Sequence, residues 1–136
     1  MISGDTRFSE NLIRYAQGCD LLIHEVAFSK KGHVKGFEAA YAHHTQPMDA
    51  GRVFSQVRPR LAVYSHVIVF PGTQVRDLIK ETRKTYEGHL VVAEDLTVFD
   101  LENGKVKVQF LGNVLGKLEL FWNQYRKFKK DGNQSI

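Results

Sequence analysis

The residues best suited to chemistry in this sequence are carboxylates and histidines at expected strand ends or the adjoining loop: Asp5, His24 with Glu25, and His66. Hydrolases with two metal ions bind them through carboxylate oxygens and neutral imidazole nitrogens, with the ions about 3.5–4 Å apart. A single histidine at a strand end is more often a structural residue held by hydrogen bonds. The order of the residues and the elements that carry them must therefore decide the matter.

Two uninterrupted apolar runs, 21–26 and 61–65, predict buried strands. The first delivers Glu25, preceded by His24, at its carboxyl end, and the second ends at His66. The opening residues resemble the last part of another strand that runs into a polar turn at Asp5. Because functional groups in α/β folds gather at the carboxyl ends of strands, we expect these three side chains to lie close together.

Helices are predicted between Ser9 and Gly18, over 47–57 and near 73–87. Serine is a favourable N-cap, proline suits the first turn of the second helix, and apolar residues recur on one face of each. Residues 29–46 are polar and carry too little apolar periodicity for a long element. We interpret that segment as a loop with one helical turn.

The remaining chain predicts a strand at 90–93 and a hairpin at 97–108, because Asn103-Gly104 supplies the two positive φ values of a type I′ turn. Strands that alternate with helices indicate a layered α/β or α+β arrangement.

Five motifs follow one another in a recognisable order. They are Ser3-Gly4-Asp5-Thr6, Asp20-Leu21-Leu22-Ile23-His24-Glu25, His44-Thr45-Gln46-Pro47, Ser65-His66 and Ala93-Glu94-Asp95-Leu96. This order closely resembles the C-terminal half of metallo-β-lactamase-fold hydrolases, in the ribonuclease Z and arylsulfatase-like branch. The resemblance implies that residues 1–110 form the C-terminal half of an αββα sandwich. Residues 111–136 would add an amphipathic basic helix and tail.

The resemblance implies a site with two divalent metal ions, zinc or else manganese. Asp5 would bridge the ions, with its side chain fixed by the Gly4 turn and by the Thr6 hydroxyl. His66 matches the last metal-ligand histidine of the family. A helix cap is the alternative role for Asp5, although Ser9 is better spaced for it.

His44 matches the histidine of the family's mobile His-Ser/Thr-Thr loop, which resembles a proton donor to the leaving group rather than a ligand. Glu25 would orient it. The alternatives are a solvated loop histidine and a buried glutamate paired with Arg or Lys. His33 and His43 have no counterpart in the family. Any role for the acidic pair Glu94-Asp95 is left open.

Two departures from the family pattern limit the assignment. The His-x-His-x-Asp-His metal motif is absent from this chain, so we expect an incomplete enzyme that depends on a missing N-terminal half. His66 is followed by Val67-Ile68-Val69 rather than by Phe-Ser-x-Arg-Tyr, which favours the arylsulfatase-like or phosphodiesterase side. The prediction is a metal-dependent hydrolase of phosphate or sulfate esters. The alternatives are a ribonuclease Z-type tRNA 3′-processing endonuclease and a non-catalytic half-fold binding or dimerising module.

Composition agrees with one compact domain: the chain has 136 residues, of which 43% are hydrophobic. A single cysteine, Cys19, excludes an internal disulfide and suits the cytoplasm. No apolar run approaches the roughly 20 residues of a membrane span. Most of the net charge of +4 falls in residues 113–136, which would either pack on the sheet or dock on a partner or an anionic surface. The expected partners are a small ester or an RNA substrate and a second copy in a homodimer.

Overall fold

The computed structural model describes residues 1–28, 35–102 and 105–110. The chain divides into two compact units, residues 1–93 and 94–136. The helix expected in 111–136, the Asn103-Gly104 turn and His33 lie outside the described residues. No helix in the described part of the chain is both long and apolar enough to cross a bilayer.

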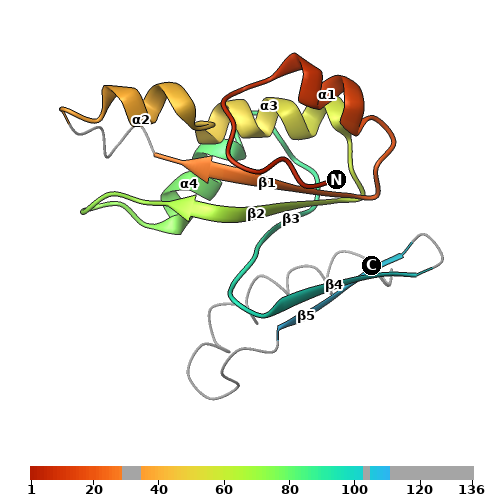
Figure 1. Cartoon of the computed structure of the whole chain (residues 1–136). Helices are drawn as coiled ribbons and strands as arrows, with labels where there is room; N and C mark the ends of the chain where they lie inside the picture. The colour runs from red at the N-terminus through yellow and green to blue at the C-terminus, as the bar shows by residue number, and fades with distance from the viewer. Residues whose placement is uncertain (29–34, 103–104, 111–136) are drawn as a thin grey trace. The chain divides into compact units, whose positions relative to one another are not determined.

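The first unit is built on a parallel sheet with the order β1-β2-β3 (Figure 1). Its strands are β1 (Leu21–Ala27), β2 (Leu61–Ile68) and β3 (Leu90–Val92). Ile2 forms a parallel bridge with Ile23, so the opening residues continue the sheet beside β1 as the sequence indicated. Their polar turn therefore lies at the same sheet edge as the carboxyl end of β1.

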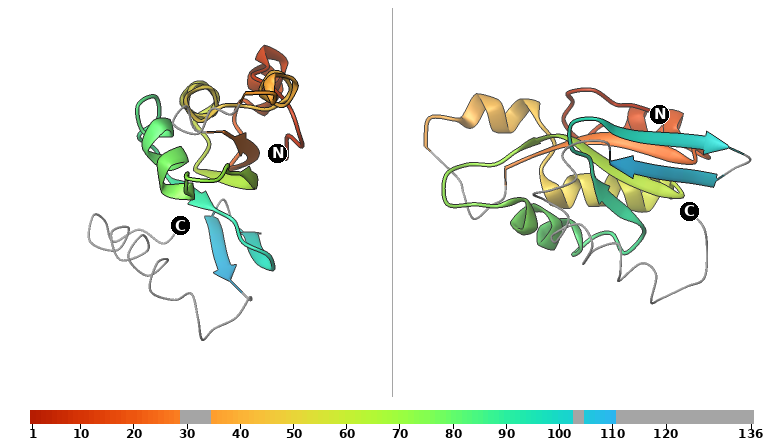
Figure 2. Two further views of the ribbon diagram at one scale, coloured as in Figure 1. Left: turned by 90° about the vertical axis from the view of Figure 1, so that its left-hand side faces the viewer. Right: turned by 90° about the horizontal axis from the view of Figure 1, so that it is seen from below.

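In the described part of the first unit, four helices accompany this sheet: α1 (Glu10–Ala16), α2 (Glu38–His43), α3 (Pro47–Val57) and α4 (Val75–Thr82). Helices α1 and α3 lie on the same side of β1 and β2 (Figures 1 and 2). The core between helices and sheet comprises Leu12, Ile13, Ala16, Leu22, Val26, Ala50, Val53, Phe54, Val57, Ala62, Tyr64, Leu78, Tyr86 and Leu90. The predicted bounds of α3 are confirmed, and the Ser9 hydroxyl caps α1 by accepting a hydrogen bond from the Leu12 amide.

The helix expected over 73–87 is shorter than predicted, and side-chain hydrogen bonds explain both ends. Gln74 and Asp77 form a reciprocal capping box that starts α4 two residues late. At the other end, the Thr82 hydroxyl donates to the Leu78 carbonyl at 2.9 Å. Such bonds from threonine to the preceding turn compete with regular helix continuation.

The second unit contains an antiparallel hairpin of β4 (Thr97–Glu102) and β5 (Lys105–Phe110). Glu102 lies opposite Lys105, so two residues connect the strands, as the sequence predicted. Strand β5 alternates exposed and less exposed side chains, whereas β4 does so only as far as Asp100 and is exposed from there to Glu102.

Candidate metal centre

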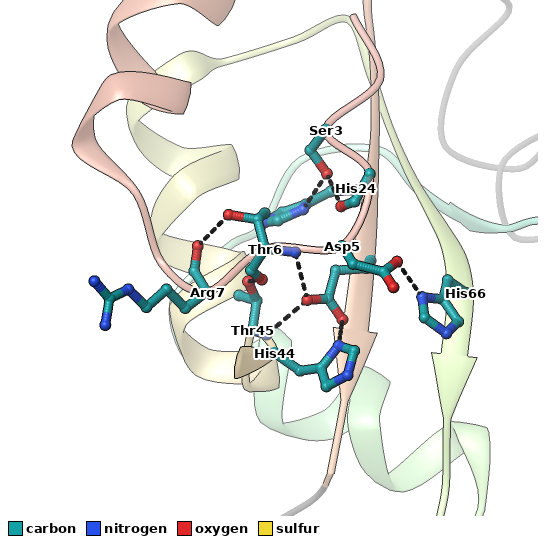
Figure 3. Close-up of polar contacts among 10 residues, drawn as sticks. Ser3, Asp5, Thr6, Arg7, His24, His44, Thr45 and His66 are labelled. Carbon is teal, nitrogen blue, oxygen red and sulfur yellow. Dashed lines mark hydrogen bonds and ion pairs between the residues drawn. The ribbon is translucent and has the colours of Figure 1, made fainter. Parts of the chain in front are cut away.

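Three side chains from separate parts of the first unit converge at one edge of its sheet. Asp5 follows the Gly4 turn, His44 ends α2 as its C-cap residue, and His66 projects from β2. One ligand atom from each lies within 4.8 Å of the other two. The structure thus brings together Asp5 and His66, the two predicted ligands, with His44, the predicted proton donor (Figure 3).

His66 reaches this position through an irregularity in β2. Glu25 pairs with Ser65 and the next residue, Val26, pairs with Val67, so His66 is skipped in the register between the two strands. Its φ of 48° lies in the left-handed region, which is uncommon for a residue with a Cβ. Bulges of this kind re-aim a side chain. The expectation that the strand ends at His66 is wrong, because β2 continues beyond the bulge.

The His66 ring meets Asp5 directly. Its Nδ1 atom is hydrogen-bonded to Asp5 Oδ1 (Figure 3). The side chains of Asp5 and His66 are 62% and 47% exposed. Both residues are therefore open to a ligand from solvent.

Glu25 lies next to these residues but in a different environment, with only 2% of its surface exposed. Its Oε1 atom accepts hydrogen bonds from the backbone amides of Thr6 and Thr45, each at 3.0 Å. Its Oε2 atom lies 3.0 Å from Nδ1 of His44. Among the described residues no Arg or Lys pairs with Glu25, so the sequence-based alternative of such an ion pair is not found there.

Two threonines complete the surroundings of Glu25. The Thr45 hydroxyl donates to the Thr6 carbonyl at 2.5 Å, and Ala27 N donates to the Thr45 carbonyl at 2.9 Å. The Thr6 hydroxyl donates to the Arg7 carbonyl at 2.9 Å rather than to Asp5. The prediction that this hydroxyl fixes the Asp5 side chain is therefore wrong, and the backbone amide of Thr6 is the group that ties the turn to Glu25.

Aromatic rings flank His44 on one side. The Phe28 and Phe70 rings are stacked with centroids 4.6 Å apart, and Tyr41 packs edge-on against Phe28 at 4.7 Å. Phe28 in turn lies 5.9 Å from the His44 ring, which lies 5.6 Å from His66. We did not predict this cluster, because its members come from three segments whose contact no local pattern records.

Comparison with known proteins finds similar sequences among ribonuclease Z proteins. The chain is 33% identical over 95 residues to ribonuclease Z of Myxococcus xanthus, covering 70% of this chain and 30% of that protein. It is 28% identical over 101 residues to ribonuclease Z of Anoxybacillus flavithermus, covering 74% and 31%. No family model matches the chain.

A solved structure has a similar fold. The metallo-beta-lactamase fold protein YhfI from Bacillus subtilis superposes with a TM-score of 0.57 at 22% identity, over 68% of this chain and 36% of that one. The chain has part of a metallo-β-lactamase fold, and its sequence is similar to that of ribonuclease Z proteins. It spans about a third of the length of the relatives it matches. The predicted recognition and layered fold class are confirmed.

Within this partial metallo-β-lactamase fold, the other residues considered from sequence lie as follows. His43 is exposed in the last turn of α2. Glu94 and Asp95 begin the second unit. His24, beside Glu25 on β1, was given no role from sequence, yet it is buried and lies 2.7 Å from the Ser3 hydroxyl. The sequence did contain a signal for this burial. His24 lies two residues from both Leu22 and Val26, so it shares their core-facing side of the strand.

Proposed function

We propose that this chain supplies one side of the active site of a metal-dependent hydrolase acting on phosphate or sulfate esters. Asp5 and His66 hold metal, His44 donates a proton to the departing oxygen, and Glu25 orients His44. The observation that carries the proposal is the convergence of ligand atoms of Asp5, His44 and His66 within 4.8 Å. The buried Glu25 carboxylate lies beside them and is hydrogen-bonded to His44.

The donor set fits divalent ions of intermediate hardness. A carboxylate and imidazole nitrogens suit zinc and also manganese, and a carboxylate has two oxygens with which to span a pair of ions. When bound, such ions polarise the ester and make water a stronger acid. Asp5 and His66 are exposed enough to accept them, and their present mutual hydrogen bond occupies one atom of each.

His44 is placed to act as the acid. Its Nδ1 atom faces Glu25 Oε2 at 3.0 Å, which leaves Nε2 as the atom that can deliver a proton. Glu25 holds the His44 ring in one orientation, since two backbone amides fix the carboxylate itself. As water forms a new bond to phosphorus or sulfur, the bond from that atom to the leaving oxygen breaks, and the leaving oxygen takes the Nε2 proton.

The same Nε2 atom could instead bind metal, because a ligating histidine commonly donates its other ring N–H to a carboxylate. The two roles have different consequences when His44 is removed. A ligand loses metal, whereas an acid loses rate only for poor leaving groups. Metal analysis of His44→Ala, together with its rates on alkyl and nitrophenyl esters, distinguishes the two roles.

The direct test uses a chimera in which this chain replaces the matching segment of the Myxococcus ribonuclease Z. We expect hydrolysis of bis-p-nitrophenyl phosphate or of an aryl sulfate in the presence of zinc or manganese, abolished by Asp5→Ala and by His66→Ala. The exposed Glu10→Ala, on the outer face of α1, is the matched control and should retain full rate. Activity that survives Asp5→Ala would remove the central assignment.

A ribonuclease Z-type tRNA 3′-processing nuclease is the second candidate, supported by the names of the sequence relatives. The same chimera distinguishes it, since cleavage of a tRNA precursor in preference to the simple diester favours the nuclease. A chimera that folds but hydrolyses none of these substrates favours a non-catalytic binding or dimerising module. Gel filtration of the chain would then show whether two copies associate.

A further inference from the structure

His24 is the buried polar residue that the proposed mechanism does not use. It lies on the face of β1 that packs against the helices, with 1% of its surface exposed. Its ring meets Phe54 of α3 edge-on, with centroids 5.9 Å apart and an interplanar angle of 87°. Nε2 is buried and has no hydrogen-bond partner among the described residues. The ring therefore makes its polar contact through Nδ1 alone.

The hydrogen bonds of the Ser3 hydroxyl determine which nitrogen of the His24 ring carries the proton. The Ser3 Oγ atom lies 2.7 Å from His24 Nδ1 and 2.9 Å from the Gly4 carbonyl oxygen. A carbonyl can only accept, and a serine hydroxyl has one proton to give. Both contacts are hydrogen bonds only if Ser3 donates to Gly4 and His24 donates from Nδ1 to Ser3. The buried Nε2 then carries a lone pair and no proton.

This relay ends at the turn that presents Asp5. Gly4 has φ of 64°, and a Cβ built on it would meet nothing within 4 Å, so the backbone conformation and not space calls for glycine there. On the near side of Asp5, Ser3 is held by His24 and by its own amide, which donates to the Ile23 carbonyl at 3.0 Å. On the far side, the Thr6 amide is held by Glu25.

Asp5 thus sits between two anchors that come from neighbouring residues of one strand. Successive side chains of a strand point to opposite faces, so His24 and Glu25 reach the turn from its two sides. We propose that His24 is a positioning residue: as the Nδ1–H tautomer it donates to Ser3, Ser3 donates to the Gly4 carbonyl, and the turn holds the Asp5 carboxylate ready for metal. The last clause rests on the proposed function, whereas the relay itself does not.

Burial also keeps this ring neutral, as the relay requires. Desolvation lowers the pKa of His24 to about 4. A proton on Nε2 would place an unpaired charged donor in the core, next to Phe54.

The tautomer can be observed in the chain itself, without metal or substrate. Long-range ¹H–¹⁵N correlation of a ¹⁵N-labelled sample near neutral pH should show His24 protonated at Nδ1 and bare at Nε2. Ser3→Ala should shift the Nδ1 resonance and leave those of His43, an exposed histidine, unchanged. A ring protonated at Nε2 overturns the proposal.

Zinc affinity, measured by titration of the same chain, tests the positioning role. Outer-shell changes cost about 10- to 100-fold in metal affinity. We expect that loss in Ser3→Ala and in His24→Phe, which keeps a ring against Phe54 but has no donor. His24→Asn places an amide N–H near the position of Nδ1 and should recover most of the affinity.

Equal losses in His24→Phe and His24→Asn, or full affinity in Ser3→Ala, would contradict a role in positioning Asp5. The outcomes also separate the two proposals. If the isolated chain binds no zinc, the same variants are compared in the chimera, which has both sides of the site, and a chimera without zinc counts against the proposed function. The tautomer decides the relay in either case.

Discussion

The two carboxylates of the candidate site differ sharply in their surroundings. Glu25 belongs to a buried network with Thr6, Thr45 and His44, in which its oxygens face three donors. Asp5 belongs to an open edge with His66, where its side chain is 62% exposed. A carboxylate whose oxygens are already occupied by protein donors is an anchor, whereas an exposed one keeps the capacity to bind an ion. The buried network is thus Glu25 with Thr6, Thr45 and His44, and the open edge is Asp5 with His66.

The comparison assigns different tasks to residues only a few ångströms apart. The buried network fixes two turns and a histidine to the end of β1 through backbone amides. The open edge relies on the strained backbone at His66, whose φ of 48° is maintained by the bulge in β2.

The largest effect should come from His44, which joins the two regions. In the chimera, His44→Ala should keep its metal and lose roughly 10²- to 10⁴-fold in rate on an alkyl phosphate ester, because the alkoxide needs a proton to depart. A nitrophenyl ester should lose much less, since nitrophenolate leaves unaided. Steady-state rates on both esters and metal analysis of the purified variant provide the measurement. Equal losses on the two esters, or loss of metal, would make His44 a ligand or a structural residue.

Glu25→Ala should cause the next largest effect, on stability. It leaves the amides of Thr6 and Thr45 and the His44 ring without their shared acceptor, and removing one partner of a buried charged contact costs about 3–5 kcal/mol. Urea unfolding of the chain followed by circular dichroism measures the loss. Glu10→Ala, an exposed glutamate on α1, is the matched control and should cost under about 0.5 kcal/mol. Similar values for the two variants would mean that the network is not an anchor.

Acid should destabilise the fold through the buried His24. The pKa of His24 is lowered by burial from 6.5 to about 4, so the unfolded chain binds more protons at this residue between those pH values. Its neutral, buried state stabilises the fold above pH 6.5, and that contribution of about 3 kcal/mol is lost as the pH falls towards 4. Unfolding free energies measured at pH 7 and pH 4.5 should therefore differ less in His24→Phe than in the wild type. Equal pH dependence in both would place the titrating group elsewhere.

The sequence predicted the elements of the site better than its connections. Helix α3 begins at Pro47 and ends at Val57 as expected, because a proline at the first turn and an apolar face are local signals. The meeting of Asp5 with His66 followed from the rule that strand ends share an edge. The helix signal is local, and the meeting of Asp5 with His66, 61 residues apart, needed only the positions of the strand ends.

What the sequence missed depends on contacts between distant segments. The bulge at His66 exists only in the register between β1 and β2, so an apolar run could not reveal it. The acceptors of Glu25 are filled by backbone amides of Thr6 and Thr45, and every residue except proline has such an amide. The link from His24 to Ser3 spans 21 residues and depends on the pairing of the opening residues with β1.

The smallest change in unfolding free energy should come from a substitution at the open edge, and it should become large only when zinc is present. Asp5→Asn changes an exposed side chain, so without metal the unfolding free energy should move by under about 0.5 kcal/mol. An ion that binds only the folded chain stabilises it by about 2.7 kcal/mol at a hundred times its dissociation constant. The wild type should therefore gain stability with added zinc while Asp5→Asn gains much less, and Asp100→Asn, in the second unit, should behave as the wild type. Urea unfolding with zinc and with a chelator gives both numbers for each variant. A zinc-dependent gain in Asp5→Asn as large as in the wild type would show that the ion binds elsewhere and that the open edge is not the metal site.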